Sequence, residues 1–210
     1  MRKAKLAIFA SGRGSNAVAI IKATQAEDFP AEVAIVLSDN HDAPVLDKAR
    51  ALGVKAIWLD PGPKRTFLIP EVEKRWVEVL RKHNVDYVLL AGFMRVIKKS
   101  MLDAFAGRIL NIHPALLPSF KGLDAQRQAW EYGVRYSGAT VHFVDDSLDG
   151  GPIILQEPVK VEDDDTPESL AARILEAEHR IYPEAVRLLA HGHLKVERRR
   201  VKILKETHGG

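Results

Sequence analysis

Residues 5–16 read KLAIFASGRGSN and hold the first strong structural signal of the chain. Residues 5–10 form an apolar run with the length of a buried strand, and the glycines and serines after it mark a tight turn. A helical stretch, AVAIIKAT, comes next at residues 17–24. A strand, a glycine-rich loop and a helix in this order predict the first part of a parallel α/β sheet.

The same alternation of strands and helices continues through the first half of the chain. Apolar runs at residues 31–39, 86–92 and 109–114 are typical of strands buried on both faces, and residues 72–84 show helical spacing. We therefore expect a Rossmann-like, mostly parallel twisted sheet in the N-terminal half.

The second half has a different pattern. Two longer runs, GATVHFVDD at residues 138–146 and GPIILQEPVKV at 151–161, are joined by a turn and predict mixed or antiparallel strands. Thr166 can cap a long helix whose first residue is Pro167, with a kink or interruption at Pro183. Two short runs after residue 193 predict a closing strand pair.

Composition excludes several classes of protein. The 210 residues are 46% hydrophobic and 28% charged, which is typical of a globular chain. No apolar run reaches the roughly 18–20 residues that span a bilayer, and the start has too short an apolar part for a signal peptide. Zero cysteines exclude disulfides, thiolate zinc sites and thiol nucleophiles. We expect a cytoplasmic protein with no membrane partner.

The formal charge of +3 comes from the C-terminal end. Residues 195–210 contain six Lys or Arg and two Glu, a local charge of +4, which leaves −1 on the other 194 residues. A short basic end is usually a solvated edge strand. We therefore expect no nucleic-acid partner.

The loop at residues 11–16 is the first candidate site. An anion can bind to the amide groups at the start of the helix that follows, and the two glycines allow its close approach. Ser15 and Asn16 can cap the helix or donate to a phosphate. The loop matches neither the Walker pattern nor G-x-G-x-x-G. The alternative is a tight turn before a capped helix, but we favour phosphate binding.

Asn111-Ile112-His113-Pro114 ends an apolar strand and is the second candidate. Residues two apart on a strand point to the same side, so Asn111 and His113 can face one pocket. Asparagine can donate to a developing oxyanion, and histidine can exchange a proton near neutral pH. A histidine at a strand end can equally be structural.

Two further strand ends and two polar clusters complete the candidates. Leu148-Asp149-Gly150-Gly151 either presents a carboxylate or forms a simple turn. Residues 91–95, AGFMR, either border a large ligand or mark the edge of the core. His191 with His193, and the acidic run 163–165, fit the ends of the long helix better than a metal site. We expect no bound metal.

Together these motifs resemble the phosphoribosylglycinamide (GAR) formyltransferase family over nearly the whole chain. The resemblance is carried by SGRGSN (11–16), AGFMR (91–95), NIHPALLPSFKG (111–122), GATVHFVDDSLDGGPIILQ (138–156) and EAEHRIYP (176–183). NIHPxLLP recurs in folate-dependent formyltransferases and hydrolases, so it indicates formyl chemistry. SGRGSN indicates the phosphorylated acceptor.

The resemblance implies a role for each motif. The catalytic groups would be Asn111, His113 and Asp149. The phosphorylated acceptor would be held by Gly12, Arg13, Gly14, Ser15 and Asn16, with Glu178 on its ribose or glycinamide. The folate would be bordered by Asn111, Met94, Arg95, Val96, Ile97, Val144, Asp145, Asp146, Ser147, Leu148, Asp149 and, from a shortened segment at 60–67, Arg65. Asp145, Asp146 and Ser147 add charge to the loop expected at the folate, and the RRR run near the C-terminus belongs to no family motif.

The implied activity is transfer of a formyl group from 10-formyltetrahydrofolate, a co-substrate, to the amine of glycinamide ribonucleotide in purine biosynthesis. The implied organisation is one domain over residues 1–210, with a phosphate-binding half at 1–100 and a dependent folate and catalytic half at 101–210. The substrates are small molecules, and a monomer and a homodimer are both compatible with the sequence. The alternatives are a formyltetrahydrofolate hydrolase and a non-catalytic nucleotide-binding module.

Overall fold

The computed structural model describes residues 2–204, which divide into two compact units. Of the described residues, the first unit contains those up to Asn111 together with Val144–Asp146, and the second contains Ile112–Phe143 together with those from Ser147 onward. Residues 205–210 of the basic end lie outside the described residues. The single dependent domain over residues 1–210 stays a prediction.

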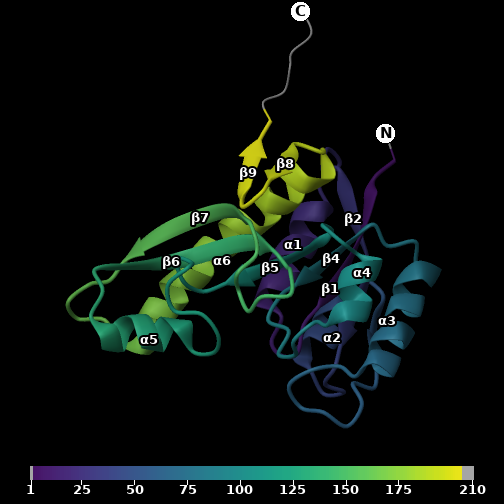
Figure 1. The fold of residues 1–210 in the computed structure, drawn as a ribbon, viewed down its shortest axis with the longest axis horizontal. Coiled ribbons are helices and arrows are strands. Elements are labelled where there is room, and N and C mark those ends of the chain that lie inside the picture. The colour runs from purple at the N-terminus through teal and green to yellow at the C-terminus, as the bar shows by residue number, and fades with distance from the viewer. Residues whose placement is uncertain (1, 205–210) are drawn as a thin grey trace, which may run out of the picture. The chain divides into compact units, whose positions relative to one another are not determined.

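The first unit is a parallel sheet with helices between its strands (Figure 1). Its elements are β1 (Ala4–Phe9), α1 (Ser15–Thr24), β2 (Ala31–Ser38), α2 (Pro44–Ala51), β3 (Ala56–Trp58), α3 (Pro70–Lys82), β4 (Tyr87–Leu90), α4 (Lys99–Ala104) and the start of β5 (Ile109–His113). The strand order is β3-β2-β1-β4-β5, and all four pairs are parallel. The Rossmann-like prediction is confirmed.

An aromatic cluster packs beside the carboxyl end of β1. The rings of Phe9, Trp76 and Phe93 contact one another at centroid distances of 5.1, 5.3 and 5.6 Å. Phe9 and Trp76 are fully buried, and Trp76 comes from the apolar face of α3. Buried aromatic pairs of this kind add stability beyond their buried area, so they fix the strand end from which the glycine loop leaves.

The second unit holds α5 (Ala125–Tyr132), β6 (Tyr136–Phe143), β7 (Ile153–Lys160), α6 (Pro167–Ala190), β8 (Leu194–Glu197) and β9 (Arg200–Ile203). β6 pairs with β7, and β8 with β9, in antiparallel fashion, as predicted. The helix α6 packs against β6 and β7 (Figure 1). Within residues 2–204, no helix is long and apolar enough to cross a membrane.

The helix α6 begins as predicted but does not break where we expected. Thr166 caps it and Pro167 is its first residue. Of the kink or interruption expected at Pro183, the interruption is wrong, because the helix continues through this residue to Ala190. A kink at Pro183 stays a prediction. Proline removes one backbone hydrogen bond, but buried side chains on both sides of it, including Tyr182 and Val186, hold the helix against its neighbours.

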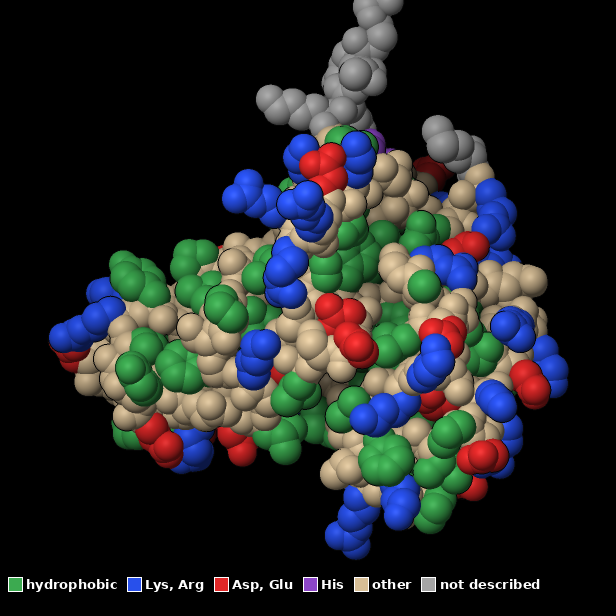
Figure 2. Space-filling model, in the orientation of Figure 1, with side chains coloured by type: hydrophobic (Ala, Val, Ile, Leu, Met, Phe, Trp, Pro, Cys, Tyr) green, Lys and Arg blue, Asp and Glu red, His purple; other side chains and the backbone are tan. Residues whose placement is uncertain are grey.

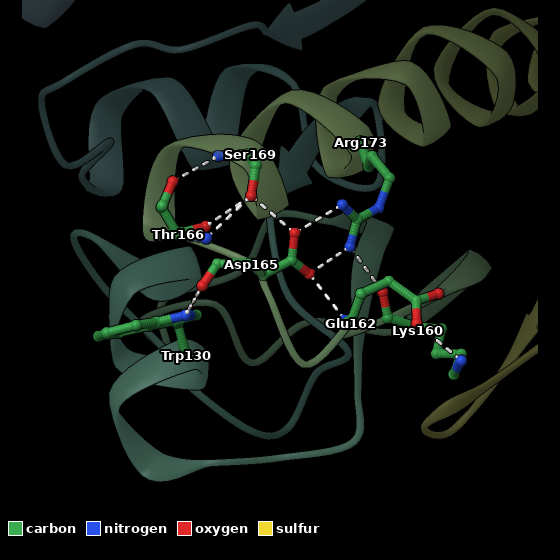
Figure 3. Close-up of polar contacts among 7 residues, drawn as sticks. All are labelled: Trp130, Lys160, Glu162, Asp165, Thr166, Ser169 and Arg173. Carbon is green, nitrogen blue, oxygen red and sulfur yellow. Dashed lines mark hydrogen bonds and ion pairs between the residues drawn. The ribbon is translucent and has the colours of Figure 1, made fainter.

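A buried carboxylate fixes the start of α6 (Figure 3). The Oδ1 atom of Asp165 lies 2.7 Å from Arg173 Nη1 and 2.6 Å from Ser169 Oγ, and its Oδ2 atom accepts from the amide of Glu162 at 2.8 Å. The indole of Trp130, from α5, donates to the Asp165 carbonyl at 2.6 Å. Chiefly because of the Arg173 guanidinium, the pKa of Asp165 lies far below its ordinary value of 3.8. This cluster joins α5 and α6.

Replacing Asp165 with asparagine is expected to lower the free energy of unfolding at pH 7 by about 2 kcal/mol, because Arg173 loses its counter-charge but, at 36% exposure, keeps some access to water. A carboxyl whose pKa is lowered on folding stabilises the protein above its unfolded pKa, and this contribution is lost as the pH falls below 3.8. The difference in free energy of unfolding between the variant and the parent should therefore become smaller at acidic pH. Urea unfolding at pH 7 and at lower pH measures it.

Asp163 provides the matched control. It belongs to the same acidic run, but its ion pair with Arg135 is almost fully exposed. Asp163→Asn should change stability by less than about 1 kcal/mol, since exposed pairs contribute little. Equal losses for the two variants would contradict a special role for Asp165.

Candidate active site

The glycine-rich loop places a pocket at the start of α1. Gly14 is the N-cap of this helix, with φ 68° in the left-handed region, and Ser15 is the first helical residue. The expectation that Ser15 or Asn16 caps the helix is therefore wrong: glycine adopts the conformation that the turn requires without steric cost. A Cβ atom at Gly14 would lie 2.1 Å from Cγ2 of Val45, so the site also requires a residue without a side chain.

The pocket has a volume of about 300 Å³ and is lined by Ser11, Gly12, Arg13, Gly14, Ser15, Asn16, Ala91, Gly92 and Met94. Carbonyl groups of the loop already accept hydrogen bonds: Gly12 from Val45 N at 3.2 Å, and Arg13 from Lys48 Nζ at 2.9 Å. The first backbone hydrogen bond of α1 is donated by Val18 N to Gly14 O. The amides of the residues before Val18 are therefore not donors in the helical hydrogen-bond pattern. Such a helix start favours an anion.

The segment after β4 contacts this loop. The amide of Met94 donates to Ser11 Oγ at 2.9 Å, and the side chain of Met94 is exposed. The Arg95 guanidinium, by contrast, turns inward: its Nε lies 2.6 Å from Asp39 Oδ2, and Nη1 donates to the Lys64 carbonyl. The two paired side chains are only 12% and 8% exposed. Arg95 therefore offers a ligand little of its charge.

Two predicted folate segments lie side by side in the first unit. The amide of Val96 donates to the Thr66 carbonyl at 2.8 Å, and Val96 forms an isolated parallel bridge with Phe67. This pairing brings the exposed Arg65 into the same neighbourhood as the exposed Val96, whereas Ile97 is buried in the core. Val144 belongs to this unit too, because its amide donates to Ile109 O at 2.9 Å.

A histidine–aspartate pair forms in the second unit. His113, at the end of β5, is buried, and its Nδ1 atom lies 3.5 Å from Oδ2 of Asp149. The other ring nitrogen, Nε2, lies 2.7 Å from the carbonyl oxygen of Phe120. The amide of Gly122 donates to the same Asp149 Oδ2 at 2.9 Å. The segment 120–122 thus contacts both members of the pair.

The Phe120 carbonyl decides which nitrogen of His113 carries a hydrogen. A carbonyl only accepts, so Nε2 must be the donor, and Nδ1 is the position that faces Asp149. A proton can therefore pass between Nδ1 and the carboxylate. The 3.5 Å separation between Nδ1 and Oδ2 is longer than a hydrogen bond.

Comparison with known proteins identifies the family of this chain. A family model described as formyl transferase matches residues 4–186. The phosphoribosylglycinamide formyltransferase of Bacillus subtilis is 40% identical over 188 residues, covering 88% of this chain and 94% of the relative. The chain belongs to this formyltransferase family.

Solved structures extend the comparison. Glycinamide ribonucleotide transformylase 1 from Symbiobacterium toebii is 49% identical, with a TM-score of 0.92, covering 97% of this chain and 95% of that one. A formyltetrahydrofolate deformylase from Pseudomonas syringae is 23% identical, with a TM-score of 0.87, and this chain covers 67% of it. At that identity the deformylase shares the fold alone.

A second histidine, which sequence reasoning did not single out, also faces Asp149. His142 is buried on β6, and its Nε2 atom lies 3.9 Å from Asp149 Oδ1. Its Nδ1 atom lies 2.8 Å from the Phe143 carbonyl, so Nδ1 is the donor. The available signal was a titratable residue inside the apolar run TVHFV, where a buried polar group needs a partner.

The remaining predicted residues are placed as follows. Glu178 is a buried carboxyl on α6, and Ser147 and Leu148 are exposed in the turn before Asp149. Asp146 is exposed, and Asp145 and Asn111 are half-buried in the first unit. Among residues 2–204, no three His, Cys, Asp or Glu side chains are grouped so as to hold a metal ion.

The second unit also contains a pocket that no sequence motif marked. It measures about 420 Å³ and is lined by Leu116, Ser119, Phe120, Tyr132, Val134, Tyr136 and Ser137. The Phe120 ring lies 5.8 Å from that of Tyr132. Figure 2 shows hydrophobic side chains gathered over α5, and the exposed Leu123 and Tyr132 belong to this region. The residue that binds His113 through its carbonyl therefore also lines an apolar pocket.

Proposed function

We propose that this protein transfers the formyl group of 10-formyltetrahydrofolate to the amine of 5'-phosphoribosylglycinamide, giving formylglycinamide ribonucleotide and tetrahydrofolate in purine biosynthesis. The observation that carries the proposal is the His113–Asp149 pair in a chain 40% identical to a GAR formyltransferase over 88% of its length. The pocket at the glycine loop suits the phosphate of the acceptor.

The reaction begins with attack of the acceptor amine on the formyl carbon. The tetrahedral intermediate carries a negative oxygen and a positive nitrogen, so the enzyme must stabilise the first and move a proton from the second to the departing folate nitrogen. His113 and Asp149 are suited to the proton transfer, because the Phe120 carbonyl leaves Nδ1 of His113 on the side of the carboxylate. Positioned proton transfer contributes about 10²–10⁴-fold to rate.

Asn111 is suited to stabilise the negative charge on the oxygen of the tetrahedral intermediate. Its amide group can donate to the oxyanion, and one such donor is worth about 3–4 kcal/mol of transition-state stabilisation. In this proposal His142 orients Asp149 from the other side, since its Nε2 atom faces Oδ1 of the carboxylate. No covalent intermediate is needed for these steps.

In this proposal, separate groups of residues bind the phosphorylated acceptor and the folate. Gly12, Arg13, Gly14, Ser15 and Asn16 hold the phosphate, and Glu178 contacts the ribose or glycinamide. The folate is bordered by Arg65, Met94, Arg95, Val96, Ile97, Asn111 and residues 144–149. Because the Arg95 side chain pairs with Asp39, Arg95 contacts the folate chiefly through its backbone.

The substrates are small molecules. We place the protein in the cytoplasm, as a monomer or homodimer without nucleic-acid or membrane partners.

Ser15→Ala is expected to raise KM for the phosphorylated acceptor about tenfold, since a hydrogen bond to a charged phosphate contributes roughly 1.5–3 kcal/mol. Its kcat and its KM for the formylfolate should stay close to those of the parent, because the proposal assigns Ser15 to the phosphate and not to the formyl transfer. Steady-state kinetics with each substrate varied in turn measures this. A loss confined to kcat would contradict the phosphate assignment.

The decisive experiment mixes the purified protein with 10-formyltetrahydrofolate, with and without glycinamide ribonucleotide, and follows deformylated folate by absorbance. The proposal expects folate release only with the ribonucleotide, matched by an equal amount of formylated ribonucleotide. Release without it, with formate accumulating, would instead identify a hydrolase. No release in either mixture would favour the non-catalytic nucleotide-binding module.

A further inference from the structure

The turn that carries Asp149 has an unusual backbone. Asp149 is not glycine, yet its φ is 46°, in the left-handed region. Such a conformation is strained for a residue with a side chain and persists only where the surroundings hold it. Gly150 is packed tightly, since a Cβ atom there would lie 2.2 Å from Ser147 Oγ. The position of the Asp149 carboxylate therefore depends on contacts that fix this turn.

One of these contacts comes from the basic run that no family motif uses. Arg198 and Arg199 form the two-residue turn between β8 and β9, and Nη2 of Arg199 donates to the Gly150 carbonyl at 2.7 Å. The hairpin is held beside the start of β7, where Ile153 pairs with Arg200. Figure 2 shows Lys and Arg side chains gathered over this hairpin, and the described contacts give Arg199 a specific partner.

We propose that Arg199 is a positioning residue for the formyl transfer: its guanidinium holds the Gly150 carbonyl and so keeps Asp149 in reach of His113. This inference rests on the proposed function, in which Asp149 takes part in proton transfer. A charged donor forms a stronger hydrogen bond to a carbonyl than a neutral one. The Asp149–His113 separation is 3.5 Å, and a turn free to relax would no longer hold the carboxylate at this distance.

The test compares four variants of the full chain: Arg199→Ala, Arg199→Gln, Arg199→Lys and, as matched control, Arg198→Ala. Arg198 is its neighbour in the same turn and has no hydrogen bond or ion pair in the described structure. We expect kcat to fall about tenfold in the Ala and Gln variants, a typical effect of small misplacement of a catalytic group. KM for the phosphorylated acceptor should not change, lysine should restore part of kcat, and Arg198→Ala should match the parent.

A second measurement reports the turn independently of catalysis. Amide hydrogen exchange in the peptide covering residues 147–152 should become faster in Arg199→Ala and stay unchanged in Arg198→Ala. Faster exchange together with the selective fall in kcat supports the proposal. Faster exchange with unchanged kcat, or no change in either, overturns it. Absence of formyl transfer in the parent protein would overturn the proposed function and this role with it. If the parent is active and the Arg199 variants have the kcat of the parent, only the positioning role is overturned.

Discussion

His113→Ala is expected to lower kcat for formyl transfer by about 10²–10⁴-fold, the range typical of a positioned proton-transfer group. The reason is geometric: this ring is the one that joins the Phe120 carbonyl to the Asp149 carboxylate. KM for the formylfolate should change little, because no folate contact is assigned to His113. Steady-state turnover with saturating substrates measures the loss.

Two further variants make the His113 result interpretable. Because His113 is buried, His113→Asn is made beside the alanine variant to preserve volume, and circular dichroism confirms that both are folded. His41→Ala removes an exposed histidine of the first unit and should leave turnover unchanged. Turnover within a few-fold of the parent in both His113 variants would contradict its role in proton transfer.

Gly14→Ala is expected to destabilise the protein by about 3 kcal/mol, through left-handed strain and overpacking together. The new Cβ atom would lie 2.1 Å from Cγ2 of Val45, in a backbone with φ 68°. At roughly 2–4 °C per kcal/mol for a chain of this size, Tm should fall by about 10 °C. Differential scanning calorimetry measures the shift, and KM for the phosphorylated acceptor should rise as the loop is displaced.

Gly12 in the same loop supplies the control. A Cβ atom at Gly12 would meet nothing within 4 Å, so Gly12→Ala should keep the parent's Tm. In the double variant Gly14→Ala with Val45→Gly, removal of both clashing carbons of residue 45, Cγ2 at 2.1 Å and Cβ at 2.5 Å, should recover part of the stability relative to Val45→Gly alone. Equal Tm values for the two glycine variants would show that the packing against Val45 is unimportant.

The sequence was sufficient to predict the features that depend on local patterns. Buried parallel strands appear as continuous apolar runs, so β1 and β5 could be located, and Thr166 with Pro167 marked the start of α6. The interruption predicted at Pro183 did not occur. Proline has a low intrinsic helix propensity, but buried contacts on both sides of this residue hold the helix. The helix continues because packing outweighs one missing hydrogen bond.

The contacts that organise the His113–Asp149 pair could not be predicted in this way. The partner of His113 Nε2 is a backbone carbonyl, and any residue type at position 120 provides one, so no motif reveals it. His142 and Arg199 are brought to Asp149 and Gly150 only by the fold, so no local pattern marks either residue. Arg95 was expected to border the folate, but its side chain had a buried partner, Asp39, 56 residues earlier.

The Asp39–Arg95 pair has a consequence for how this protein can evolve. Loss of either partner leaves the other as a charge with little access to water, which costs about 3–5 kcal/mol, whereas joint replacement by apolar residues can be nearly neutral. The two positions are therefore epistatic: a substitution that is harmful alone becomes acceptable once the other has occurred. Changes at these two positions should therefore arise as coupled pairs and follow slow mutational paths.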